Sequence, residues 1–330
     1  MSEQTASPPV APEATGSPAS SLLRRRDWRD YAIYLGFAAV FLLFAVFLSD
    51  DGFLTSDNLL NVVRQSAIIA IMAVAVTFVI AAAEIDLSIG SVAGLSSVSA
   101  AMAIAATGST VVGVLAGLGV GLAAGMINGG LVTLLGIPSF LVTLAMLGIA
   151  FGVAQLITAS APQPILDDTF TGIFGAGDVG PIPSLLIWVV VFVAVGAVIL
   201  AKTRYGREVL ATGGNRIAAE FSGVNTSRIK FSVLVASGVV ASIAGMLYAG
   251  RLESGRYQWG TGDELSVIAA VILGGTSLFG GRGTVIGSLF GALLIGLINN
   301  GLILAGLDIS QQQIIRGVII ILAVALARKK

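Results

Sequence analysis

Apolar residues occur along this chain in ten long runs that are separated by short polar connections. Most of the runs hold about 18 residues or more, which is enough to cross a bilayer as a helix. They lie at Tyr31–Leu48, Ser66–Ala83, Ile89–Ala106, Val111–Leu135, Phe140–Ile157, Ser184–Leu200, Phe231–Gly250, Leu265–Leu278, Thr284–Leu304 and Ile309–Leu326. The pattern predicts an all-α integral membrane protein with about ten transmembrane helices. The eighth run is short, and eight spans are the alternative if two short segments are re-entrant.

Composition agrees with a membrane protein and excludes several kinds of chemistry. Hydrophobic residues make up 56% of the chain, charged residues make up 11%, and the mean hydropathy is +0.96. The absence of Cys and His excludes disulfides and the commonest metal ligands and proton carriers. The sequence lacks a Walker-type phosphate loop, and its Gly-rich stretch Gly274–Gly283 indicates a tight turn between helices. We therefore expect a transport role, with no enzyme activity, no metal and no cofactor.

The basic residues predict the topology, because cytoplasmic loops carry an excess of Lys and Arg. Basic residues precede the first run, follow the last one and fill the connection 201–230, whereas residues 65–201 contain none. Both termini and this connection are therefore expected in the cytoplasm, which requires an even number of spans. Residues 1–23, rich in Pro, Ser and Ala, are expected to form a disordered tail, and residues 24–330 the transmembrane domain.

The connection 201–230 also has a pattern of its own. Residues 212–215 (Thr-Gly-Gly-Asn) predict a turn, Asn215 predicts the N-cap of a short helix with one apolar side, and Gly223 predicts its end. A short helix held between two spans suits docking to a cytosolic partner. The alternative is a basic loop that lies on anionic lipid.

Polar residues within or beside the spans are candidates for a translocation pathway, because such groups are costly in lipid. Amides suit a path for neutral, hydroxyl-rich solutes, and they equally suit hydrogen bonds between helices. Glu84 and Asp86 belong either to a short cytoplasmic turn that caps the next helix or to a conformationally important element of the pathway. The candidates are Glu84, Asp86, Asn128, Gln155, Asn299 and Asn300.

Glycines recur every four residues in the fourth run and therefore share one helix face. The predicted role is tight helix packing within one subunit, and a dimer face is the alternative. They are Gly113, Gly117, Gly121, Gly125 and Gly129.

Three blocks of sequence resemble the permease subunit of bacterial ribose-type ABC importers. They are "EIDLSIGS" (Glu84–Ser91), "TRYGREVLATGGNRIAAEFSGVN" (Thr203–Asn225) and "ELSVIAAVILGGTSLFGGRGTVIGSLFGALLIGLINNGL" (Glu264–Leu302). The resemblance runs from about residue 31 to residue 330, in order and with similar spacing. It implies a multi-pass protein of the bacterial inner membrane that forms the pathway for a monosaccharide or related polyol.

The resemblance also implies partners. These are a cytosolic ABC ATPase subunit, a periplasmic sugar-binding protein and a second permease copy, most simply an identical one, with no nucleic acid. A coupling helix of such permeases fits a groove on the ATPase. Its matching positions here are Gly213, Gly214, Asn215, Arg216, Ala218, Ala219, Glu220, Phe221 and Gly223. The binding protein is expected on the periplasmic loops, at Asp167, Asp168, Arg251 and Arg256.

Two other functions are weighed against this one. A permease for branched-chain amino acids or nucleosides shares much of the architecture, and the three sequence blocks argue against it. A secondary transporter needs ion-coupling groups at the midplane, for which Glu84, Asp86 and Arg316 are the sequence candidates.

Overall fold

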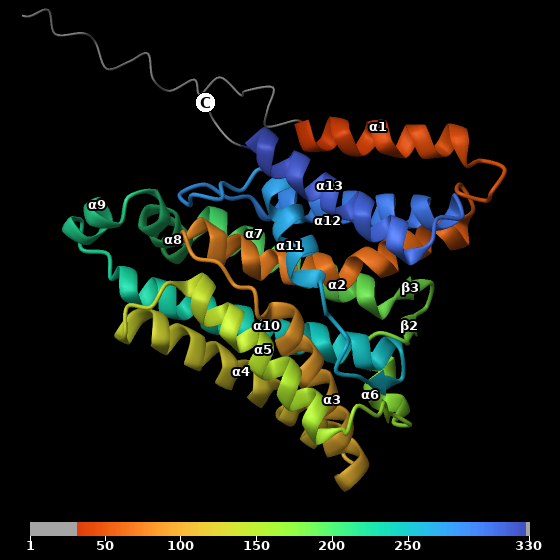
Figure 1. Ribbon diagram of the computed structural model, residues 1–330, viewed down its shortest axis with the longest axis horizontal. Helices are drawn as coiled ribbons and strands as arrows, with labels where there is room; N and C mark the ends of the chain where they lie inside the picture. Colours follow the sequence, from red (N-terminus) through yellow and green to blue (C-terminus); the bar gives the residue numbers. More distant parts are fainter. Residues whose placement is uncertain (1–31, 328–330) are drawn as a thin grey trace, which may run out of the picture.

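A computed structural model describes residues 32–327 of the protein. This part of the chain is built almost entirely from helices, which Figure 1 shows as one bundle. The helices are α1 Ala32–Phe47, α2 Ser56–Ala81, α3 Ile89–Thr107, α4 Thr110–Leu134, α5 Ser139–Ile157, α6 Asp168–Ile173, α7 Ser184–Lys202, α8 Arg204–Gly214, α9 Arg216–Phe221, α10 Thr226–Arg251, α11 Asp263–Leu273, α12 Val285–Leu304 and α13 Ile309–Ala327. The predicted tail 1–23 lies outside the described residues.

Seven of the described helices are long and apolar enough to cross a membrane, namely α2, α3, α4, α5, α7, α10 and α12. A shorter apolar stretch, Ile33–Phe47, fills α1. Helix α13 coincides with the last predicted span, although the side chain of Arg316 is not among those described. The prediction of an all-α membrane protein is therefore confirmed.

The eighth predicted span, Leu265–Leu278, is wrong as a continuous helix. Helix α11 has 11 residues, which rise about 16 Å, half of the roughly 30 Å hydrocarbon core. The helix ends at a Gly-Gly pair, in which Gly275 has the left-handed φ of +92° that few other residues adopt. The remaining residues up to Thr284 form a non-helical connection to α12.

Polar residues at the helix starts explain several boundaries, because their side chains accept hydrogen bonds from backbone N–H groups that have no partner within the helix. Thr55 accepts from Asn58 N at the start of α2, and Ser109 accepts from Val112 N at the start of α4. Thr284 accepts from Gly287 N at the start of α12. The starts of α4 and α12 agree with the boundaries that the apolar runs predict, whereas α2 begins at Ser56, ten residues before the predicted start at Ser66.

Helices α4 and α10 pack closely through the predicted glycine strip. A Cβ placed on Gly121 would lie 2.2 Å from the carbonyl oxygen of Gly238 in α10, and one on Gly125 would lie 2.8 Å from Cα of Val235. Only glycine allows such an approach of two backbones. The expected packing within one subunit is confirmed.

The bundle has two distinct ends. Helices α8 and α9 project at one end, toward which the first residues of α1 and the last residues of α13 also lie (Figure 1). The opposite end carries α6 and two short antiparallel ladders. In these ladders, β1 (Gln163–Pro164) pairs with β4 (Ser254–Gly255), and β2 (Asp178–Val179) pairs with β3 (Ile182–Pro183).

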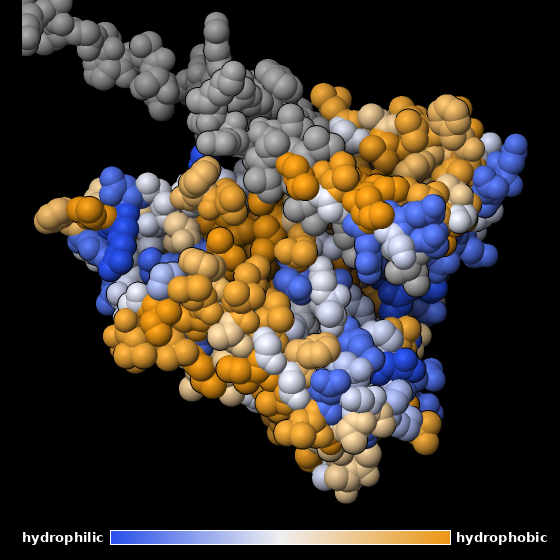
Figure 2. Space-filling model, viewed as in Figure 1, coloured by the Kyte–Doolittle hydropathy of each residue, from blue (hydrophilic) through white to orange (hydrophobic). Residues whose placement is uncertain are grey.

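Apolar side chains cover much of the outer surface, as Figure 2 shows in orange. Leu115 in α4, Leu144 in α5 and Val195 in α7 are each more than half exposed. A soluble protein rarely presents apolar surface on this scale, so these faces are suited to lipid or to another apolar partner.

Candidate functional site

The positions expected to contact the ATPase, apart from Gly223, lie on two short helices joined at Asn215, which we call the α8–α9 segment (residues 204–221). Asn215 ends α8 and caps α9, and its Oδ1 accepts a hydrogen bond from Ala218 N at 3.0 Å. The predicted N-cap is therefore confirmed. The predicted turn over residues 212–215 is wrong, because α8 continues through Gly214 and the chain bends only at Asn215.

The end of α8 is helical because it packs directly on two other backbones. A Cβ on Gly213 would lie 2.0 Å from the carbonyl oxygen of Ala81, the last residue of α2. Gly281, in the connection between α11 and α12, donates its N–H to the same carbonyl at 2.9 Å and approaches Gly214. Three segments thus meet without side chains between them.

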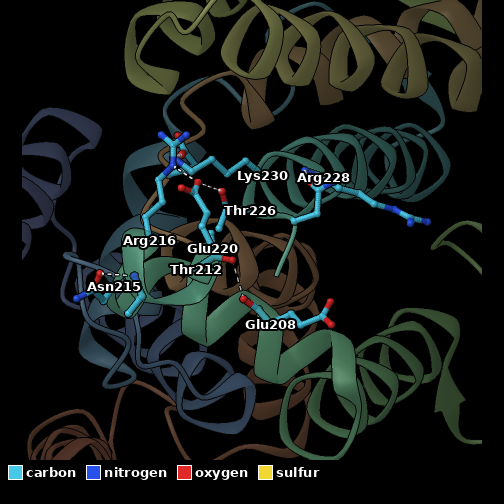
Figure 3. Close-up of polar contacts among 11 residues, drawn as sticks. Glu208, Thr212, Asn215, Arg216, Glu220, Thr226, Arg228 and Lys230 are labelled. Carbon is cyan, nitrogen blue, oxygen red and sulfur yellow. Dashed lines mark hydrogen bonds and ion pairs between the residues drawn. The ribbon is translucent and has the colours of Figure 1, made fainter. Parts of the chain in front are cut away.

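A polar cluster holds α9 against the start of α10 (Figure 3). Glu220 accepts hydrogen bonds from Thr226 Oγ1 at 2.6 Å and from Arg216 Nε at 2.8 Å, and Figure 3 shows the three side chains pointing toward one another. These bonds, that of Thr226 first, lower the pKa of Glu220. Arg228 points away from the cluster.

One face of α9 presents apolar side chains to the outside. Ile217 and Phe221, four residues apart on one helix face, are 67% and 90% exposed, whereas Ala219 is buried. Figure 2 shows orange atoms at this tip beside a blue surface. A large apolar side chain that is almost fully exposed beside basic residues is suited to a pocket on a protein partner.

A buried ion pair joins α10 to the segment between α2 and α3. Lys230, in the first turns of α10, pairs with Glu84, whose side chain is 6% exposed. An open pocket of about 170 Å³ adjoins the pair and is also lined by Arg216 and Ser139. The start of α10 is thereby connected to residues 82–88.

Residues 82–88 are non-helical and are held by side chains of neighbouring helices. Ser139 Oγ accepts from Ile85 N at 3.0 Å, and Thr143 Oγ1 accepts from Leu87 N at 3.1 Å, both from α5. Ala83 adopts a φ of +62° where the segment leaves α2. These bonds satisfy backbone groups that would otherwise be buried without partners.

Asp86 occupies the interior of the bundle. It accepts from Ser88 N at 2.8 Å, from Ser88 Oγ at 2.6 Å and from Ser237 Oγ of α10 at 2.6 Å. Asn128 of α4 donates to Ser88 Oγ at 3.0 Å. The expected short turn that caps α3 is not what forms, because Ser88 makes no side-chain cap and Asp86 is 1% exposed.

The other pathway candidates lie in different places. Asn300 of α12 exchanges two amide hydrogen bonds with Asn58 of α2, at 2.8 and 3.1 Å, which is the expected alternative of a bond between helices. Asn299 is buried, and Gln155 is exposed on α5. The structure does not bring the six candidates together into one site.

The docking candidates lie toward the opposite end of the bundle. Asp167 caps α6 and accepts from Thr110 Oγ1 at 2.6 Å, a bond that lowers the pKa of Asp167. Arg251 donates to the carbonyl of Arg64 at 3.2 Å. Asp168 and Arg256 are exposed, and the guanidinium of Arg256 lies 5.3 Å from the ring centroid of Trp259. Asp167 and Arg251 thus bond to neighbouring residues and stabilise the loops, while the side chains of Asp168 and Arg256 are accessible to a partner.

Sequence reasoning missed two features of this region. The partner of Glu84 is Lys230, and nothing in either sequence context indicates the pairing. Thr226 was not among the candidate residues, although its position shortly after the short helix allows its side chain to bond to that helix. Within residues 32–327, no group of three or more Asp, Glu, His or Cys side chains is arranged to hold a metal ion.

Comparison with known proteins identifies relatives along nearly the whole chain. A profile of the family described as branched-chain amino acid transport system / permease component matches residues 58–324. The ribose import permease protein RbsC of Escherichia coli K12 is 39% identical over 300 residues, which cover 89% of this chain and 92% of the relative. RbsC of Bacillus subtilis is 38% identical over 290 residues, covering 88% of this chain and 90% of the relative.

A further relative is the L-arabinose ABC transporter permease protein AraH of Azospirillum brasilense. It is 38% identical over 294 residues, covering 88% of this chain and 86% of the relative. No solved structure matches the chain.

Proposed function

The chain belongs to the permease family of ABC importers, and from this premise we propose that it forms the translocation pathway for a monosaccharide or related polyol. It is a multi-pass protein of the bacterial inner membrane and a transport component rather than an enzyme. The observation that carries the sugar assignment is the similarity to ribose and L-arabinose permeases over about nine-tenths of the chain.

The experiment that tests this assignment is uptake by the reconstituted importer. The permease, its cognate ATPase and its binding protein are placed in liposomes with ATP, and uptake of labelled D-ribose, L-arabinose and L-leucine is compared. Uptake of a sugar without uptake of leucine supports the proposal. Uptake of leucine alone favours a branched-chain amino acid permease, the alternative that the family's description raises.

The family implies two kinds of partner, and we propose where they bind. The α8–α9 segment receives the ATPase, supported by the exposed Phe221 and Ile217 at the tip of the molecule. The binding protein docks at the opposite end, supported by the exposed Asp168 and Arg256. A ligand biases a conformational equilibrium only through its differential affinity for the two states, and ATP supplies that bias through the ATPase.

Contacts within the described chain support a route by which this bias reaches the interior. Motion of α9 pulls on Thr226 through Glu220, and motion of α10 pulls on Glu84 through Lys230. Residues 82–88 continue directly to Asp86 and the start of α3. Because the packed interior resists gradual deformation, such a connection favours switching between two arrangements.

For the topology we propose ten crossings with the α8–α9 end in the cytoplasm. The six basic residues of the connection 201–230 support this orientation by the positive-inside rule. One crossing is made by α11 together with the non-helical connection to α12, because Gly281 of that connection reaches the end of α2. Non-helical backbone at this depth is tolerated where protein covers it.

We also propose that two identical copies pair in the membrane and that lipid covers the remaining apolar faces. The exposed apolar side chains of α4, α5 and α7 support both contacts, because lipid and a second apolar surface cover such faces equally well.

A further inference from the structure

After α10, the chain turns back into the bundle before α11 begins. Residues 256–262, which we call the returning segment, run along the first half of α3. Ser97 Oγ donates to the carbonyl of Arg256 at 3.1 Å. Further along, a Cβ on Gly94 would lie 2.7 Å from the carbonyl of Tyr257, and one on Gly90 would lie 2.1 Å from the carbonyl of Gly260. The segment therefore descends along α3 from Ser97 to Gly90.

This descent brings the start of α11 to membrane depth. Helices α3 and α10 run toward the same end, and a Cβ on Gly245 of α10 would lie 2.0 Å from the carbonyl of Ala93. At 1.5 Å per residue, Gly90 lies about 13 Å inward from the end of α10, a helix about 39 Å long. Gly260 and Glu264, which touch Gly90, lie at the same depth.

The returning segment is polar and partly open. The side chains of Arg256, Gln258 and Thr261 are exposed, and Glu264 is half-buried. In Figure 2, pale and blue atoms cross this otherwise orange face, where Figure 1 shows the connection between α10 and α11. Irregular backbone at membrane depth occurs where protein covers it or where it lines a water-filled cavity. The backbone here packs on α3, and the exposed polar side chains favour water over lipid on the outer face.

Glu264 is an ionisable group at this depth whose carboxylate makes few bonds. Its Oε2 accepts one hydrogen bond, from Gly262 N at 3.2 Å, and it forms none of the ion pairs found within residues 32–327. The carboxylate fits because Gly90 has no side chain: a Cβ there would lie 2.6 Å from Oε2. A carboxylate with free acceptor positions inside a membrane is costly unless it serves a passing ligand or an ion.

Other polar groups of the region also have unused bonding capacity. The hydroxyl groups of Ser254 and Ser266, on either side of the returning segment, are buried without a hydrogen-bond partner in the described structure. Gln258 and Thr261 present an exposed amide and an exposed hydroxyl group. Acceptors and neutral donors, with a single negative charge among them, are the set that binds the hydroxyl groups of an uncharged polyol.

We propose that Glu264, with Gln258 and Thr261, forms a contact site for sugar hydroxyl groups about a third of the way along the translocation pathway. This inference rests on the proposed function and adds the residues that touch the substrate within the membrane. Glu264 accepts hydrogen bonds from two hydroxyl groups, while Gln258 and Thr261 supply both donors and acceptors. The site lies beside residues 82–88 through Gly90, so it is positioned to change when the coupling contacts move.

The first test compares Glu264→Gln with Glu253→Gln in the complete importer in liposomes, with D-ribose and L-arabinose as probes. Glu253 is an exposed carboxylate of the same loop, nearer the surface, and serves as the matched control. We expect Glu264→Gln to lower sugar uptake about tenfold, because a hydrogen bond to a charged acceptor is lost. The number of sugar molecules moved per ATP hydrolysed is expected to fall as well. Glu253→Gln is expected to retain wild-type uptake. Wild-type uptake by Glu264→Gln would overturn the proposal.

A second test uses the absence of cysteine from the chain. Thr261→Cys is treated with a membrane-impermeant thiol reagent applied to both sides of the vesicles, and Leu144→Cys, on the apolar face of α5, serves as control. We expect Thr261→Cys to react, and to react several-fold more slowly with D-ribose, binding protein and ATP present, while Leu144→Cys does not react. A Thr261→Cys variant that is never labelled would contradict a water-filled path here.

If the Glu264→Gln permease does not assemble with its partners, the variant Gln258→Ala provides the test instead. Gln258 is exposed and its side chain makes no bond within the described chain, so this variant keeps the fold. It is expected to raise the sugar concentration for half-maximal uptake several-fold, and no change would count against the site. A wild-type importer that takes up neither sugar refutes the proposed function instead, and the thiol labelling then still decides whether the segment lines a water-filled path.

Discussion

Lys230 on α10 and Glu84 between α2 and α3 form an ion pair that is largely shielded from water. The pair connects the start of α10, where Thr226 bonds to Glu220 of the α8–α9 segment, to the non-helical residues that lead to Asp86. Removing one partner leaves a buried charge uncompensated, which is far costlier than removing both. This relationship therefore gives a clear test of how the two regions depend on each other.

The first prediction concerns this pair. Lys230→Met is expected to lower the free energy of unfolding by about 3–5 kcal/mol, because the buried carboxyl group of Glu84 then lacks its partner. The double variant Glu84→Gln with Lys230→Met is expected to recover most of the loss. Thermal unfolding of the purified permease measures both. A double variant that is no more stable than Lys230→Met would contradict the predicted recovery.

The second prediction concerns the apolar tip of α9. Phe221→Glu is expected to reduce recovery of the ATPase with the permease about tenfold, because an exposed aromatic anchor would be lost from the interface. Leu166→Glu is the matched control, since Leu166 is 91% exposed at the opposite end of the bundle. Co-purification from membranes, with permease levels measured in parallel, provides the comparison. An intact complex with Phe221→Glu would mean that the ATPase binds elsewhere.

The third prediction concerns pH and Glu220. Hydrogen bonds from Thr226 and Arg216 lower the pKa of Glu220 below its usual 4.5. A lowered pKa in the folded state means that the stabilisation is complete above the unfolded-state pKa and is lost as the pH falls through the folded-state value. Wild type is therefore expected to lose more stability than Glu220→Gln on acidification from pH about 7 to about 3.5. Identical acid sensitivity in thermal unfolding would contradict this assignment.

The fourth prediction concerns the contact of α4 with α10. Gly121→Ala is expected to destabilise the protein by about 1–3 kcal/mol, because the new methyl group meets the backbone of Gly238. Gly119→Ala on the same helix has open space around it, so it is expected to be neutral or to stabilise by up to about 1 kcal/mol. Thermal unfolding of both variants checks the difference. A neutral Gly121→Ala would show that the two helices separate more easily than the packing indicates.

The fifth prediction concerns delivery by the binding protein. Asp168→Lys is expected to raise the binding-protein concentration for half-maximal stimulation of ATP hydrolysis several-fold, because charges at an interface rim act mainly on association. Asp168→Asn is expected to have an intermediate effect, and both effects are expected to shrink at high salt. Membrane insertion of the permease should not change. Normal stimulation of Asp168→Lys would place docking away from α6.

The local features of the α8–α9 segment followed from its sequence. Asn215 caps α9 because its short side chain reaches a backbone N–H three residues ahead, and Gly223 has the positive φ that ends the region. The predicted turn at 212–215 failed for a tertiary reason. Gly213 and Gly214 stay helical because α2 and the α11–α12 connection pack closely against them.

The placement of polar residues was much less predictable. Asp86 and Asn300 were selected as pathway groups by their polarity, yet both bond to neighbouring helices in the interior. Glu264 was not among the pathway candidates, and the returning segment carries it to membrane depth. A polar residue in an apolar run has the same sequence signature whether it faces water, a ligand or another helix.

The sequence by itself determined the membrane class, the positions of nearly all long helices and the glycine contact of α4, because each depends on residues close together in the chain. The tertiary structure alone decided that α11 is half a span, that Glu84 meets Lys230, and that residues 256–262 return along α3. These features depend on which distant backbones approach one another. That approach is settled by the packing of the whole bundle, where small residues allow contacts that no local pattern specifies.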